Sequence, residues 1–373
     1  MATAVQQRLE RLLGYLEADP QNLQLLFSTT EAALDSGEPG RVADLIERYR
    51  AIAPPPAELE NLAGIAAMSE GKFEAAATTF QALREAAPDD PALQFNLAWC
   101  RAMLGQWRHV ADLLDEGTIG QGARAAALKV QALHHLGDLE DALAWGQGAL
   151  ERYPDDSMLH AALAYAAFDA GEMELAMRHA ESAGATPKGH AVLGLLDLTH
   201  ERFDSALQHF DLALAQTPNE ARALLGKGLA LLAQQDFQGA SPVLDRAAET
   251  LAAHQSAWAA AAWARVALGD YAGGRERFEK ALRIDDAFAE AEGGLAVLEV
   301  LDGHLESARR RIDKALSLDP EDVSAAMAKA VLAMRQGDSA SAQRIHEAVM
   351  SLPAGTGGRT IAQSVLDFAR RRR

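Results

Sequence analysis

Cysteine is almost absent from this sequence of 373 residues: Cys100 is the single one, so no intramolecular disulfide can form. Cys100 lies within an apolar helical pattern, where we interpret it as a small buried hydrophobic residue. The N-terminal stretch MATAVQQRLERLLGYLEADP has polar residues every few positions, unlike a secretory signal, and no stretch has the continuous apolar character of a membrane span. These absences predict a cytoplasmic protein with no membrane insertion.

Positive charge is also scarce. The 35 lysine and arginine residues are outnumbered by 53 aspartate and glutamate residues, which gives a formal net charge of −18. Nucleic-acid binding depends on neutralising phosphates with basic side chains, so this balance argues against a nucleic-acid partner and against general adhesion to anionic membranes. Arginine greatly outnumbers lysine and alanine abounds, which indicates a bacterial source with a GC-rich genome.

Residue patterns typical of catalysis or metal binding are missing as well. The adjacent His134 and His135 point to different sides of a helix, whereas a helical metal pair needs a spacing of three or four residues. We interpret them as solvated or groove-lining. The acidic pairs Asp89-Asp90, Asp155-Asp156 and Asp285-Asp286 precede predicted helices, where aspartate caps free N–H groups. We therefore predict that the protein is not an enzyme and binds no cofactor or metal.

The sequence does contain one unit that recurs about every 34 residues. In residues 57–88, apolar residues at helical spacing predict two short antiparallel helices joined by a turn at Gly71. Gly64 and Ala76 have almost no side chain, so the two backbones can approach closely there, and Phe80 fills the space beside them. The turn glycine recurs as Gly37, Gly71, Gly105, Gly137, Gly171, Gly269, Gly303 and Gly337.

This pattern resembles the tetratricopeptide repeat (TPR) family, whose repeat is 34 residues long. The copies that match best are 57–88, 187–218 and 255–286, and the resemblance covers roughly residues 20–353. It implies an all-α, right-handed superhelical solenoid of about ten helix pairs. It also implies that the first helices of successive repeats line a concave groove.

A solenoid needs its end faces covered, so we predict a capping helix at each end. Residues 1–19 form the N-terminal cap, 20–354 the solenoid, and 355–373 a C-terminal cap with an arginine tail. The glycines in 116–122 predict an irregularity that is either a hinge or a longer connector. Two alternatives stay open: the N-terminal helix is a detachable arm that occupies the groove, and the tail contacts an acidic partner or the solenoid itself.

The resemblance places two positions of each first helix, six and three residues before the turn, on the concave groove. The first of these is apolar in eight of ten repeats, so the asparagine ladder of many relatives is absent. We predict a broken apolar stripe with aromatic anchors, which suits an apolar or amphipathic protein segment. The predicted groove residues are Ile65, Met68, Phe95, Trp99, Tyr165, Phe168, Leu195, Leu198, Leu229, Leu232, Trp263 and Val266.

These features favour a non-enzymatic scaffold or adaptor that binds a protein partner through the groove. One alternative is a self-assembling structural protein whose groove or end helices pair with another copy. Another is a regulatory or assembly subunit of an enzyme, or of a secretion or envelope complex, supplied in trans. The stripe can also be explained by packing of these side chains against neighbouring first helices or under a folded-in terminal helix.

Overall fold

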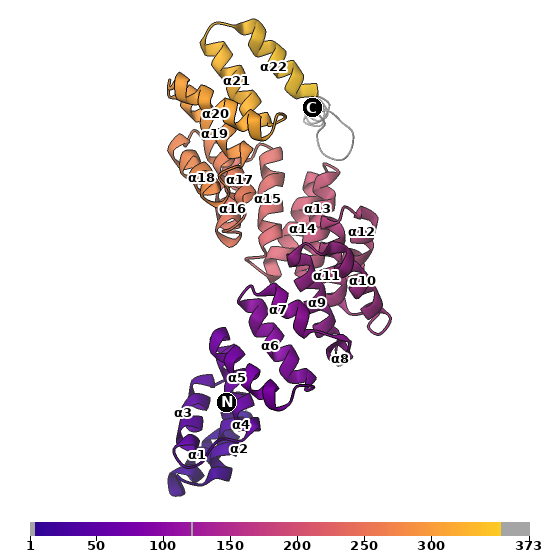
Figure 1. Cartoon of the computed structure of the whole chain (residues 1–373), viewed down its shortest axis with the longest axis vertical. Helices are drawn as coiled ribbons and strands as arrows, with labels where there is room; N and C mark the ends of the chain where they lie inside the picture. The colour runs from indigo at the N-terminus through magenta and orange to yellow at the C-terminus, as the bar shows by residue number, and fades with distance from the viewer. Residues whose placement is uncertain (1–3, 121, 352–373) are drawn as a thin grey trace. The chain divides into compact units, whose positions relative to one another are not determined.

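Pairs of helices make up most of the described part of the chain. The computed structural model describes residues 4–120 and 122–351, and all regular secondary structure in them is helical. The chain divides into two units, residues 1–183 and 184–373. Within each unit the helices follow one another as antiparallel pairs (Figure 1). The predicted fold class, an all-α solenoid of repeated helix pairs, is confirmed.

The first unit consists of a single helix α1 followed by the pairs α2/α3, α4/α5, α6/α7, α9/α10 and α11/α12, with the short α8 inserted before α9. Each first helix packs on its own second helix, and second helices such as α3, α5 and α10 also pack on the next first helix. The bounds are α1 Ala4–Ala18, α2 Leu23–Asp35, α3 Pro39–Arg50, α4 Ala57–Ser69, α5 Phe73–Ala86, α6 Pro91–Met103, α7 Trp107–Leu113, α8 Glu116–Ile119, α9 Ala123–Leu136, α10 Leu139–Leu150, α11 Ser157–Asp169 and α12 Met173–Ser182.

The second unit contains the pairs α13/α14, α15/α16, α17/α18, α19/α20 and α21/α22, packed by the same rule. The bounds are α13 Pro187–Thr199, α14 Phe203–Gln216, α15 Ala221–Ala233, α16 Phe237–Thr250, α17 Gln255–Ala267, α18 Tyr271–Ile284, α19 Ala289–Leu301, α20 Leu305–Leu318, α21 Val323–Arg335 and α22 Ser339–Ser351. The C-terminal capping helix predicted for 355–373 lies outside the described residues.

The N-terminal helix α1 covers the first repeat. Its Leu9 and Leu16 are buried in the cluster that also holds Leu26 of α2 and Leu45 of α3. The apolar side of α1 is therefore used in packing on the first repeat. The predicted irregularity at 116–122 coincides with the inserted helix α8, which follows an unusually short second helix α7 of seven residues.

The turn within each of the ten described helix pairs has a residue in the left-handed conformation. All eight predicted turn glycines have a φ between 70° and 85°, a conformation that glycine adopts without the steric penalty of a Cβ atom. Two repeats lack the glycine. There Glu201 and Gln235 hold the same left-handed conformation, with φ of 56° and 61°.

Glycines within the helices make room for aromatic rings. A Cβ atom at Gly64 of α4 would lie 2.7 Å from the Phe80 ring of α5, and one at Gly194 of α13 would lie 2.6 Å from the Phe210 ring of α14. Gly226 of the next first helix, α15, likewise leaves room for the same Phe210 ring. At Gly64 and Gly194 the space left by the missing side chain is occupied by the aromatic ring of the paired helix. At Gly274 of α18 a Cβ atom would also lie 3.3 Å from the backbone oxygen of Ala262 in α17.

Aspartates cap some of the helices as the sequence predicts. Asp90 accepts backbone N–H bonds at the start of α6, and Asp156 accepts one from Leu159 at the start of α11. The capping prediction is wrong for Asp285-Asp286. The residue that precedes α19 is Phe288, and the Asp285 carboxylate accepts instead from Ala287 within the turn.

Two buried histidines join the helices of one repeat. Nδ1 of His160 in α11 lies 2.9 Å from Nδ1 of His179 in α12, and Nε2 of His160 lies 2.8 Å from the carbonyl oxygen of Pro154. Because a carbonyl only accepts, His160 donates through Nε2 and accepts at Nδ1. His179 then donates through Nδ1, and its buried Nε2 has no partner in the described residues. Burial, with His160 beside it, lowers the pKa of His179 to about 4.

The first repeat of the second unit contains a similar pair. Nδ1 of His190 in α13 lies 3.3 Å from Nδ1 of His209 in α14, at the same sequence separation of 19 residues. This pair is only half-buried. Burial and the neighbouring His209 lower the pKa of His190.

Candidate protein-binding surface

The face of α6 is the most open part of the predicted groove in the first unit. Trp99 is 39% exposed, and Phe95, one turn earlier, is half-buried with its ring centroid 6.3 Å from that of Trp99. Met103, one turn after Trp99, is 45% exposed. We call Phe95, Trp99 and Met103 the α6 stripe. Met103 was not among the predicted groove residues, although its spacing of four residues from Trp99 places both on one helix face.

An aromatic pair lies on the helices that follow α6. Trp107, at the start of α7, stacks on His135 of α9 with centroids 4.0 Å apart and an interplanar angle of 8°. Nε2 of the neighbouring His134 lies 2.6 Å from a carboxylate oxygen of Asp169. His135 is exposed and His134 is half-buried, and each also makes a specific contact within the unit. Their interpretation as solvated or groove-lining residues stays a prediction.

The other predicted groove residues of the first unit are less open. Ile65 and Met68 of α4 are half-buried against the cluster around Phe80. Tyr165 of α11 is only 7% exposed, with its ring beside that of His134 at 6.5 Å, and Phe168 is half-buried. The apolar stripe is thus interrupted after α6.

In the second unit the predicted groove residues differ in how much of each side chain is exposed. Leu229 of α15 is 37% exposed, whereas Leu195, Leu198, Leu232 and Val266 are half-buried. The side chain of Val266 packs against α18, the second helix of its repeat. It fills the space beside Gly274 that a larger residue's Cβ atom would need. These residues contribute partly to packing and partly to the surface.

Trp263 of α17 is fixed by two contacts. Its indole Nε1 donates to Oε1 of Glu290 at 3.1 Å, and its ring meets the edge of Phe278 at a centroid distance of 5.1 Å. The remaining part of the indole lines a pocket of about 480 Å³ between α17, α19 and the start of α21. Trp263 is therefore both a packing residue and part of a surface cavity.

The helix α19 is buried along almost its whole length. Val297 and Val300, at the same repeat positions as Trp99 and Ala102, are 6% and 0% exposed. The cause is the close approach of α21: a Cβ atom at Gly293 would lie 2.5 Å from the backbone nitrogen of Ala325. At α19 the apolar groove positions are therefore used in packing between first helices, which is the alternative interpretation of the apolar stripe.

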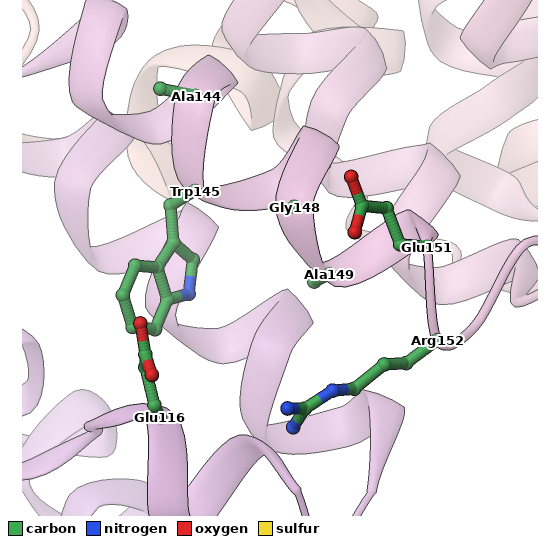
Figure 2. Close-up of a pocket in the computed structure, with 7 residues that line it drawn as sticks. All are labelled: Glu116, Ala144, Trp145, Gly148, Ala149, Glu151 and Arg152. Atoms are coloured by element: carbon green, nitrogen blue, oxygen red, sulfur yellow. The ribbon is translucent and has the colours of Figure 1, made fainter.

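A second pocket, of about 350 Å³, lies outside the predicted groove, on α8 and the second helix α10. Figure 2 shows Trp145 projecting from α10 into this pocket, with Glu116 and Arg152 at its edge. Nζ of Lys129 lies 4.9 Å from the Trp145 ring centroid, and burial lowers the pKa of this lysine. The buried indole N–H of Trp145 donates no hydrogen bond within the described residues.

No three histidine, cysteine, aspartate or glutamate side chains among residues 4–120 and 122–351 come close enough to hold a metal ion. Cys100 is fully buried, as predicted, and burial raises the pKa of its thiol to about 11. No helix in the described part of the chain is long and apolar enough to span a membrane.

Comparisons with known proteins agree with the repeat pattern. Residues 192–257 and 265–332 each match a family model described as tetratricopeptide repeat, and residues 13–140 match one described as bacterial type III secretion protein (HrpB1_HrpK). A search of curated proteins finds no match.

Solved structures with similar folds are numerous but distant in sequence. The human IFIT1 dimer with PPP-AAAA is 13% identical and has a TM-score of 0.51, over 92% of this chain and 93% of IFIT1. YrrB, described as a TPR protein with an unusual peptide-binding site, is 20% identical and has a TM-score of 0.41, over 49% of this chain and 97% of YrrB. At 13% identity the likeness to IFIT1 shows the fold alone.

Proposed function

The chain is a tetratricopeptide repeat protein, and on this premise we propose that it is a non-enzymatic scaffold that binds an apolar or amphipathic segment of a partner protein. The binding surface is the face of first helices centred on the α6 stripe. The observation that carries the proposal is the exposure of Trp99 and Met103 beside Phe95 on one helix face. Soluble proteins rarely leave such apolar groups together in water unless they serve an interaction.

The geometry of the α6 stripe matches a helical ligand. Its three side chains are spaced by four residues, so they form a row along α6 into which the apolar row of a partner helix can pack. Tryptophan dominates binding energies at interfaces, because it buries a large rigid surface. Trp99 is therefore the residue expected to contribute most.

A library of displayed 16-residue peptides tests this proposal even though the natural partner is not identified. We expect selection on the wild-type protein to enrich peptides with apolar residues at i, i+4 and i+8. These peptides should lose most of their affinity for a Trp99→Glu variant with unchanged helical content, and keep it for a matched Trp145→Phe variant. Enrichment of polar peptides, or equal binding to the Trp99→Glu variant, would contradict the proposal.

A second candidate is an assembly role in bacterial secretion. The match of residues 13–140 to a type III secretion family supports it, as well as a bacterial source. The proposal keeps the cytoplasmic location expected from the sequence, which cell fractionation tests. Loss of the gene should then reduce the amount of secreted effector proteins in a bacterium that carries it, whereas normal secretion would exclude this role.

Self-association is the remaining alternative. In a self-assembling protein the α6 stripe would bind a second copy of the chain, and the mass in solution would rise with concentration. Analytical ultracentrifugation of the wild type and the Trp99→Glu variant separates the two cases. A monomer at all concentrations favours binding of another protein, and a dimer that the variant abolishes favours self-assembly.

A further inference from the structure

The pocket beside Trp263 has a composition unlike the α6 stripe. Trp263 comes from α17, Glu290 from the first turn of α19, and the other lining residues from the turn before α21 and the first two turns of that helix. The full lining is Trp263, Glu290, Asp319, Glu321, Asp322, Val323, Ser324 and Met327. Four of the eight side chains are carboxylates and none is basic.

Within residues 4–120 and 122–351, none of these four carboxylates forms an ion pair with a basic side chain. By contrast, two other carboxylates of α19, Glu292 and Glu299, form ion pairs with Arg311. Glu292 also pairs with Lys314, and the N–O distances are 2.5 to 2.7 Å. The fold thus neutralises the carboxylates on one side of α19 and leaves Glu290 and its neighbours at the pocket uncompensated.

The local electrostatics agree with an excess of negative charge. Burial raises the pKa of Glu290, an effect that the Trp263 hydrogen bond opposes and the nearby Asp322 reinforces. Burial and Asp319 likewise raise the pKa of Asp322 against the effect of its cap bond to Ala325. The helix N-termini of α19 and α21 together supply about one positive charge, which offsets only one carboxylate of the four.

The pocket also has an apolar component. Val323 and Met327 on α21 are 43% and 38% exposed, and the indole of Trp263 is fixed in place by its bond to Glu290. A planar cation with an apolar stem satisfies both parts. Its charge would meet the carboxylates and the indole, while its methylene groups would pack on the two α21 side chains. A guanidinium fits better than an ammonium, because it stacks on aromatic rings and bonds carboxylates in pairs.

We propose that this pocket binds an arginine side chain of the partner protein. The identification of the ligand as part of a protein rests on the proposed function, whereas the affinity for the guanidinium group does not. The charge complementarity between four uncompensated carboxylates and one cation is the observation that selects this occupant. The pocket lies in the second unit and so gives a contact separate from the α6 stripe.

Fluorine NMR of protein labelled with 5-fluorotryptophan tests this directly. The chain has five tryptophans, and a Trp263→Phe variant identifies the signal of Trp263. The probe is N-acetyl-arginine amide, and N-acetyl-citrulline amide is its neutral isostere. We expect the arginine compound to shift the Trp263 signal at millimolar concentration and the citrulline compound to bind at least fivefold more weakly.

Matched variants sharpen the test. Glu321→Gln and Asp319→Asn each remove one exposed carboxylate from the pocket and should weaken the arginine probe about fivefold, an effect that salt diminishes. Glu279→Gln, on the outer face of α18, should leave binding unchanged. Equal shifts with citrulline, or an unmoved Trp263 signal, would overturn the assignment.

The chain's own arginine tail is the competing occupant. If replacing Arg370 to Arg373 by alanine makes the probe bind more tightly, the pocket serves the tail, and the assignment to a partner is wrong. A failure of the peptide selection leaves this experiment intact, because the probe needs no peptide. Conversely, if the citrulline and arginine compounds bind with equal affinity, the pocket assignment fails. The binding of the selected peptides and its dependence on Trp99 are not affected by that result.

Discussion

The helices α6 and α19 hold equivalent places in their repeats but have opposite surroundings. Trp99 and Val297 both lie six residues before a turn glycine, yet Trp99 is 39% exposed and Val297 is 6% exposed. At α19 the following first helix α21 packs tightly, because Gly293 leaves room for its backbone. After α6 come the short α7 and the inserted α8. The exposure of a groove position therefore depends on the next repeat more than on its own.

The largest expected effect comes from removing the space that lets α21 approach. Gly293→Leu should destabilise the protein by about 3 kcal/mol, because the new side chain collides with the backbone of Ala325. Urea denaturation followed by circular dichroism measures the loss. Gly148→Ala, where a Cβ atom meets nothing within 4 Å, is the control and should stabilise by about 0.5–1 kcal/mol. Equal stability of the Gly293→Leu variant and the wild type would show that α21 does not approach as described.

Substitutions at Trp99 and Val297 should have different effects, one on peptide affinity and the other on stability. Trp99→Ala should weaken a selected peptide by about 2 kcal/mol, or about 30-fold, and change the unfolding free energy little. Val297→Ala should leave the peptide affinity unchanged and lower the unfolding free energy by about 2 kcal/mol. Fluorescence anisotropy and urea denaturation of both variants give the four numbers. The comparison fails if Val297→Ala weakens binding as much as Trp99→Ala.

The two histidine pairs give a second comparison of a buried and a more exposed site. His160 and His179 are buried, whereas His190 and His209 are half-buried. His179 has a pKa of about 4 in the folded protein and an ordinary value of 6.5. The folded state therefore binds fewer protons than the unfolded state between these values, and stability is complete above pH 6.5 and falls as the pH drops towards 4. We expect a loss of about 1.4 kcal/mol between pH 7.5 and 5.5 from this residue.

Histidine titration by NMR checks that expectation site by site. The half-buried His190 should also titrate below its ordinary range, because burial and His209 lower its pKa. A His179 signal that titrates near pH 6.5, or a stability that is equal at the two pH values, would contradict the assignment of a neutral, buried His179.

The smallest effects concern the turns. Gln235→Gly and Glu201→Gly should each stabilise the protein by about 0.5–1 kcal/mol, because these residues hold a left-handed conformation that strains any side chain but is open to glycine. Gly71→Ala, at the matched turn of another repeat, should destabilise by about 1 kcal/mol. Thermal unfolding resolves shifts of this size. A lower melting temperature for Gln235→Gly would show that its side chain stabilises the turn.

Much of the fold follows from local rules that are readable in the sequence. The period of the turn glycines predicts the helix pairs, and the N-terminal cap predicted at 1–19 contains the helix α1, because both depend on residues close in the chain. The turns at Glu201 and Gln235 lack that local signal, since the surrounding helices impose the left-handed conformation there. The cap prediction at Asp285-Asp286 is wrong because α19 starts later, after Phe288.

The candidate site is harder to predict, because exposure depends on contacts between repeats. Gly293 is visible in the sequence of the α19 segment, but its role is not, because the burial of Val297 results from the packing of α21 in the next repeat. The Trp263 pocket combines α17, α19 and the turn before α21, residues up to about 60 positions apart. Only the charge and aromatic composition of those segments is visible in the sequence, and neither shows that the fold brings them together.

The ring of Phe210 has a further consequence. It is enclosed by Gly194 of its own repeat and Gly226 of the following one, so a single side chain belongs to the interior of both. If either repeat opens, the other loses one wall around this ring and is exposed to water at that point. The two repeats therefore unfold together, as a cooperative block longer than one repeat, and the reach of any local opening along the second unit is set by such shared rings.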